Sequence, residues 1–151
     1  MSYGISLVRG DSTSVVSKIT DEMLPKGGTY AAREPGSMVD ESELYFNITY
    51  NFAWYFYETL DAEQGIRVIY GKKGRDVKPM VEGAIAKLGV LVERERSGGK
   101  VLSETWGKDK VYDEEESERD YWFPCAKNAV KALRGIASLC DIAPDFTFTG
   151  D

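Results

Sequence analysis

The chain contains no histidine, and this absence restricts its chemistry more than any other feature of its composition. Histidine is a common zinc ligand and the side chain whose ordinary pKa lies nearest to neutral pH. Its absence excludes the common zinc sites and every catalytic triad or general base built on histidine. No pair of carboxylates is distinguished by its spacing either. We therefore predict no catalytic residue, no metal site and no cofactor.

Cysteine is also scarce, because the chain has only Cys125 and Cys140, fifteen positions apart. If both lie on one helix, about 22 Å separates them at 1.5 Å per residue, which is too far for a disulfide. We expect both to be small apolar residues of the core.

Long hydrophobic runs are missing as well. No stretch approaches the roughly 20 apolar residues that a membrane span requires, and residues 1–11 lack the basic start and apolar run of a signal peptide. The net charge of −6 disfavours broad binding to nucleic acid or to an anionic membrane surface. These features predict a cytoplasmic protein without a membrane partner.

What the chain does contain is an ordinary globular composition over 151 residues, which predicts a single domain, 1–151. Apolar periodicity predicts an α+β fold: a mainly antiparallel sheet packed by two main helices, about 76–88 and 124–142, and a short helix, about 51–60. Leu133 lies on the apolar stripe of the second main helix. Expected strands lie at 4–8, 14–19, 29–31, 44–50, 65–71 and 146–151, and a long loop is expected at 21–43.

The region 90–118 has a different character. Residues 90–106 predict a β-hairpin with its turn at Ser97–Gly99, and a helix stop at Gly89 precedes them. The acidic run that follows, 113–120, predicts a charged loop. We interpret 90–118 as a possible inserted hairpin with an acidic loop.

A polar motif in the aromatic stretch 44–60 is the first candidate site. Asn47 and Thr49 share one side of a predicted strand, and Asn51 begins a helix. Such side chains commonly satisfy backbone donors at a helix start, which is the structural interpretation. The functional interpretation is a pocket for a planar or amide ligand, walled by aromatic residues: Tyr45, Tyr50, Trp54 and Tyr55.

A basic turn is the second candidate. Lys72, Lys73 and Arg75 follow a predicted strand and precede a helix, so free N–H groups and positive charge could bind a small anionic ligand there. The turn is not a P-loop, because the Gly-Lys-Ser/Thr ending is missing. The alternative is a solvated loop.

The acidic run is the third candidate, for a basic partner surface or a hard cation. It lacks the alternating spacing and glycine of a calcium loop, and a solvated loop is the alternative. The residues considered for partner binding are Glu114, Glu115, Glu116, Glu118 and Asp120, next to Asp113.

Several segments resemble a group of small proteins encoded by bacteriophages and prophages. The matching segments are Asn47–Asn51 (NITYN), Ile66–Lys72 (IRVIYGK), Tyr121–Leu133 (YWFPCAKNAVKAL) and Pro144 with Asp145. The likeness covers most of the chain except about 90–118. It implies phage origin and residence in the cytoplasm of an infected cell, and it implies no catalytic residue, because the group is mostly of unknown function.

Two functions follow from these observations. The first is a non-enzymatic accessory protein that binds a host or phage protein and could inhibit a host defence system. The second is a binder of a small ligand such as a nucleotide, which uses the aromatic-polar stretch and the basic turn. An unusual hydrolase ranks last.

Overall fold

The computed structural model describes residues 2–8, 30–31, 43–101, 111–120 and 122–151. The strand predicted at 14–19 and most of the loop predicted at 21–43 lie outside the described residues.

Four strands of the described residues form one sheet in the order β2-β3-β1-β4, and every neighbouring pair is antiparallel. Alternate side chains of the central strand, Tyr3, Ile5 and Leu7, are buried, as expected where one sheet face covers a core. The strands predicted at both chain ends and around residues 30 and 47 are confirmed. Their bounds are β1 Ser2–Val8, β2 Tyr30–Ala31, β3 Glu43–Thr49 and β4 Thr147–Gly150.

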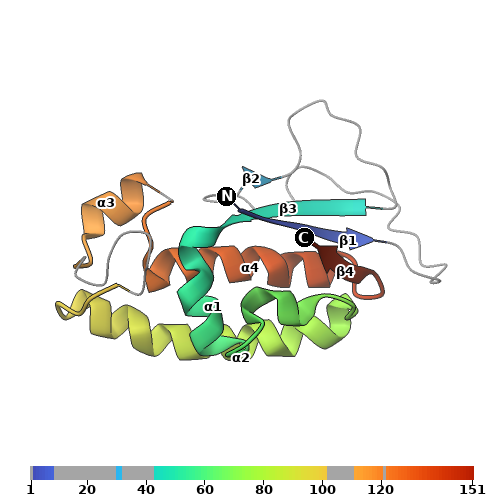
Figure 1. Ribbon diagram of the computed structural model, residues 1–151, viewed down its shortest axis with the longest axis horizontal. Coiled ribbons are helices and arrows are strands. Elements are labelled where there is room, and N and C mark those ends of the chain that lie inside the picture. The colour runs from blue at the N-terminus through green and yellow to red at the C-terminus, as the bar shows by residue number, and fades with distance from the viewer. Residues whose placement is uncertain (1, 9–29, 32–42, 102–110, 121) are drawn as a thin grey trace.

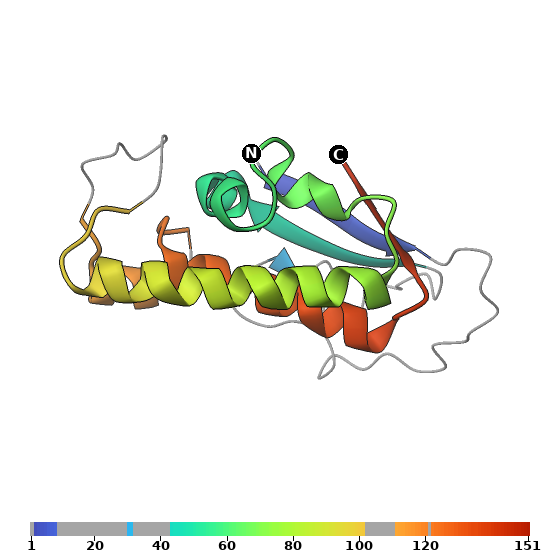
Figure 2. The same cartoon turned by 90° about the horizontal axis from the view of Figure 1, so that it is seen from below.

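The three predicted helices are present: α1 Ala53–Thr59, α2 Gly74–Arg96 and α4 Ala126–Ile142. Helices α1, α2 and α4 lie on one side of this sheet, and the fold is α+β (Figure 1). The two long helices, α2 and α4, are antiparallel and lie side by side (Figure 2). Their contact is the most extensive one between any two helices of the described residues. None of the helices in the described ranges is both long enough and apolar enough to cross a membrane.

The core fills the space between the sheet and the helices. Leu133 is fully buried there, as its place on the apolar stripe predicted. Gly135 on the same helix faces β3 so closely that a Cβ atom would lie 2.4 Å from Cζ of Phe46. Both cysteines are free and buried, as expected.

The predicted hairpin is wrong over its first half, because α2 continues through 90–96. Leu91 and Val92 continue the helical stripe that packs on the core, and Glu95 is buried. The helix ends at Arg96 with Ser97 as its C-cap residue, and Gly98 has φ +94°, the left-handed conformation typical after a helix C-terminus. The Ser-Gly-Gly signal was therefore a helix end. Beyond it, Lys100 and Val111 form an isolated antiparallel bridge.

Two further segments differ from the prediction. Residues 65–71 do not form a strand; instead η2, Gly65–Ile69, is a 3₁₀ helix whose Ile66 and Ile69 are both buried, matching its period of three. The acidic run is not a loop, because Glu114–Arg119 form helix α3. The Asp113 carboxylate accepts the N–H of Glu116 at 2.9 Å and caps that helix.

Candidate functional site

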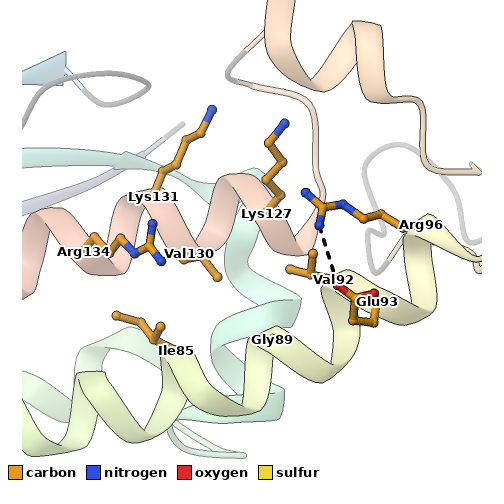
Figure 3. A pocket seen from close by; sticks show the side chains of 9 residues that line it. All are labelled: Ile85, Gly89, Val92, Glu93, Arg96, Lys127, Val130, Lys131 and Arg134. Carbon is orange, nitrogen blue, oxygen red and sulfur yellow. Dashed lines mark ion pairs between the residues drawn. The ribbon is translucent and has the colours of Figure 1, made fainter.

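A cleft lies between the C-terminal half of α2 and the N-terminal half of α4, with a volume of about 380 Å³. Its size falls in the range of ordinary ligand sites, roughly 300–1,000 Å³. Figure 3 shows the lining side chains, which come from both helices. They are Ile85, Gly89, Val92, Glu93 and Arg96 of α2 with Lys127, Val130, Lys131 and Arg134 of α4.

The cleft combines an apolar floor with a basic rim. Lys127, Lys131 and Arg134 recur at i, i+4 and i+7, so they share one face of α4 over about 10 Å. Arg96 extends from the last turn of α2 toward this row (Figure 3). Between the two helices lie the aliphatic side chains of Ile85, Val92 and Val130. The arrangement suits a ligand that carries both negative charge and apolar surface.

Helix α3 supplies the negative charge at one end of the cleft. The Lys127 ammonium forms ion pairs with Glu118 and, at 3.3 Å, with Glu114. The guanidinium of Arg96 lies 3.6 Å from Glu93 and 4.0 Å from Glu114. The glutamates are more than half exposed, and ion pairs at such positions stabilise a protein by about 0–1 kcal/mol. These contacts are therefore weak enough to exchange for others.

The pKa shifts agree with these pairs. Burial acts to lower the pKa of Lys127, but its hydrogen bonds with Glu118 and Glu114 outweigh burial and raise that pKa. The hydrogen bond with Lys127 lowers the pKa of Glu118, and hydrogen bonds from Tyr112 and then Lys127 lower that of Glu114. All three groups are thus charged at neutral pH.

Two more cations line the other end of the cleft, and Lys131, the nearer of the two to α3, also helps to lower the pKa of Glu118. Lys131 and Arg134 are exposed, and neither forms an ion pair with any residue that the structure describes. Two such cations side by side contrast with the chain's net charge of −6. Within the described ranges, these two positive charges are exposed and form no ion pair.

The polar motif of the aromatic stretch does not converge on one point. The Asn47 amide donates to Ser2 Oγ at 2.9 Å, on the sheet face opposite the core residues Phe46 and Ile48. Thr49 is buried, and its hydroxyl accepts the N–H of Asn51 at 3.2 Å, which caps η1 (Tyr50–Phe52).

Asn51 and the aromatic residues point to separate neighbours. The Asn51 side chain donates to the carbonyl oxygen of Trp122 at 2.9 Å. The ring of Tyr50 packs edge-on against Tyr3, and Trp54, 41% exposed, packs against Tyr57. These contacts agree with the structural interpretation of Thr49 and Asn51 as ties at the strand-to-helix junction.

The basic turn lies before α2, far along that helix from the cleft. The Lys72 ammonium donates a hydrogen bond to the Val68 carbonyl oxygen at 2.8 Å, and Arg75 forms an ion pair with Asp145. Lys73 is the N-cap residue of α2.

The first turn of α2 has no free backbone donors. The N–H groups of Gly74 and Arg75 donate to the carbonyl oxygens of Phe146 and Pro144, and those of Asp76 and Val77 donate to Lys73. An anion site at this helix start depended on those four groups. The positive side chains remain exposed there, but the predicted backbone cradle does not form.

The acidic residues are divided between two roles. Glu114 and Glu118 contact the cleft, whereas the Asp120 carboxylate accepts the N–H of Trp122 at 2.9 Å and supports the turn into α4. Glu115 is exposed, and the N–H of Glu116 donates to the capping Asp113. No group of three metal-binding side chains occurs in the described part of the chain.

The cleft residues were not among the predicted site residues. The i, i+4, i+7 spacing of Lys127, Lys131 and Arg134 was a usable signal, because their helix was predicted correctly. Arg96 gave no such signal, because its segment was predicted as a strand, and only the packed structure brings it opposite α4.

No protein-family model matches the chain, and neither a curated protein nor a solved structure does.

Proposed function

We propose that the chain is a non-enzymatic accessory protein that binds an acidic segment of a host or phage protein in the cleft between α2 and α4. The observation that supports this most directly is the exposure of Lys131 and Arg134 at a cleft that is also lined by aliphatic side chains. Neither cation forms an ion pair with a described residue. A positive patch in an acidic chain attracts an acidic partner and fixes its orientation.

The chemistry of the lining argues for binding rather than catalysis. The nine lining residues include no hydroxyl and no thiol, and their one carboxylate, Glu93, pairs with Arg96. Aliphatic side chains beside cations suit the mixed apolar and acidic surface of a protein segment. The resemblance to phage-encoded proteins supports a partner from the phage or its host, and occupation of a host protein's acidic surface would inhibit it.

Binding of a labelled peptide tests this function. The probe is a fluorescein-labelled peptide of Glu, Leu and Ala, and a peptide with Lys in place of Glu is its control; fluorescence anisotropy at low salt measures both. We expect the Glu peptide alone to bind, with an affinity that falls as salt rises. Lys131→Ala with Arg134→Ala should weaken binding about tenfold, the effect of losing about 1.4 kcal/mol over two charge contacts.

A matched variant separates the cleft from the basic turn. Lys72→Ala with Lys73→Ala removes the same charge at exposed positions outside the cleft. We expect it to bind the Glu peptide as the unmodified protein does. If this variant loses binding while Lys131→Ala with Arg134→Ala keeps it, the basic turn is the site. If the unmodified protein binds neither peptide, the proposed function is wrong.

A further inference from the structure

Helix α3 shows how this cleft accepts acidic side chains. Glu114 and Glu118 are four residues apart on one helix, and both contact Lys127 at the end of the cleft. Figure 1 places α3 beside the C-terminal end of α2 and the N-terminal end of α4. The chain's own acidic group at the cleft is therefore helical, with carboxylates at i and i+4.

The remaining cations continue this pattern along the cleft. Lys131 lies four residues beyond Lys127, and Arg134 three residues beyond that. Every α-helix rises about 1.5 Å per residue, so carboxylates at i+4 and i+7 of a second helix repeat at the interval of Lys131 and Arg134. A carboxylate at i of that helix lies level with Lys127, which α3 already pairs. The lined stretch of α2, from Ile85 to Arg96, measures about 16 Å, or about three helical turns.

We infer that the partner segment is an acidic amphipathic helix that lies along the cleft beyond α3. Its carboxylates contact Lys131 and Arg134, and aliphatic side chains on the same face contact Ile85, Val92 and Val130. This inference rests on the proposed function and specifies the partner's chemistry. In an extended segment consecutive side chains alternate between opposite faces, so carboxylates at i, i+4 and i+7 would not all face the cleft.

Three peptides of equal length and charge test the inference by fluorescence anisotropy. The first is an Ala-based peptide with Glu at i, i+4 and i+7 and Leu on the same face. The second has the same residues scrambled, so that Glu and Leu are spread around the helix. The third is the first peptide with one central Ala replaced by Pro, which breaks the helix. We expect the first to bind at least tenfold more tightly than either of the others.

A charge exchange locates the contact. Lys131→Glu with Arg134→Glu should lose the first peptide and gain affinity for the peptide that carries Lys at the same positions. Circular dichroism checks that the variant is folded, and Lys131→Gln with Arg134→Gln supplies a neutral version if it is not. The neutral variant should lose the first peptide without gaining the Lys peptide.

The outcomes separate the two proposals. If the scrambled and Pro-containing peptides bind as tightly as the first, the helical partner is wrong although an acidic segment still binds. If no acidic peptide binds the unmodified protein, the proposed function itself fails and the inference with it. If the charge-exchange variant keeps the first peptide, the contact lies elsewhere on the molecule and the inference is overturned.

Discussion

Glu95 connects the end of α2 to the start of α4 through a buried carboxylate. Its side chain accepts the backbone N–H of Ala126 at 2.8 Å and the hydroxyl of Tyr55 at 3.0 Å. The side chain of the N-cap residue Cys125 makes no capping hydrogen bond to α4. Glu95, on another helix, provides the acceptor that a capping side chain normally provides. Burial raises the pKa of this carboxyl to about 7, although both hydrogen bonds act to lower it. A carboxyl group that titrates near neutral pH therefore joins the two helices that form the cleft.

This pKa predicts how stability depends on pH. Between the ordinary pKa of 4.5 and about 7, the folded protein holds a proton on Glu95 that the unfolded chain has lost. Hence the free energy of unfolding falls as pH rises through this window, by on the order of 3 kcal/mol at 1.36 kcal/mol per pKa unit. Glu95→Gln keeps an acceptor without the titrating proton, so we expect its urea-unfolding free energy to lack this decline.

Other glutamates do not produce the same pH dependence. The pKa values of Glu114 and Glu118 are lowered, so their stabilising charge is lost only at more acidic pH. They therefore do not make the free energy of unfolding fall between pH 5 and 8. Glu95→Ala leaves the N–H of Ala126 and the hydroxyl of Tyr55 without this acceptor and should destabilise the protein by about 2–4 kcal/mol. Parallel pH profiles for the unmodified protein and Glu95→Gln would contradict the prediction.

At the scale of elements, the packing of α4 on the sheet depends on a glycine. Gly135→Ala places a Cβ atom where the ring of buried Phe46 lies, at 2.4 Å. Overpacking costs about 1–3 kcal/mol, and the better helix propensity of Ala offsets up to about 1 kcal/mol. We expect a net loss of about 1–2 kcal/mol in urea unfolding.

Gly83 on α2 is the matched control, because it is exposed and a Cβ atom there meets nothing within 4 Å. Gly83→Ala should stabilise the protein by about 0.5–1 kcal/mol. If both substitutions stabilise it, the contact between Gly135 and Phe46 does not limit how closely α4 approaches β3.

The elements differ in how far they could be predicted. Helix α4 and strands β1 and β3 were predictable because each has a clear apolar period and one buried face. The helical conformation of residues 90–96 was not predictable, because Val90, Val92 and two arginines occupy alternate positions, as in a strand. Only the contacts of Glu95 with α1 and α4 show that this charged residue is buried. The cleft could be predicted only in part, because α4 presents its cations in sequence whereas Arg96 joins them through tertiary packing.

At the scale of the whole molecule, the buried apolar residues of the described ranges form two hydrophobic clusters of unequal size. The large one joins the sheet to α1, α2 and α4, and it contains no buried residue from 97–125. The small one consists of Val101, Phe123 and Cys125, with Tyr112 packed against it. The described residues between α2 and α4 thus build a small core beside the main one, and the insertion predicted at 90–118 stays a prediction.

This division predicts that the main core folds without the segment between α2 and α4. We would replace Lys100–Arg119 by a short Gly-Ser linker and keep Glu95, whose contact with Ala126 holds the two helix ends close together. Loop length changes the free energy of folding only slowly, whereas loss of Val101 and of the cover over Phe123 should cost about 2–4 kcal/mol. Circular dichroism should show retained helix and sheet, and urea unfolding should stay cooperative with a lower midpoint. A non-cooperative transition, or loss of the far-ultraviolet signal, would show that the main core requires the small cluster and that the segment is not an addition to it.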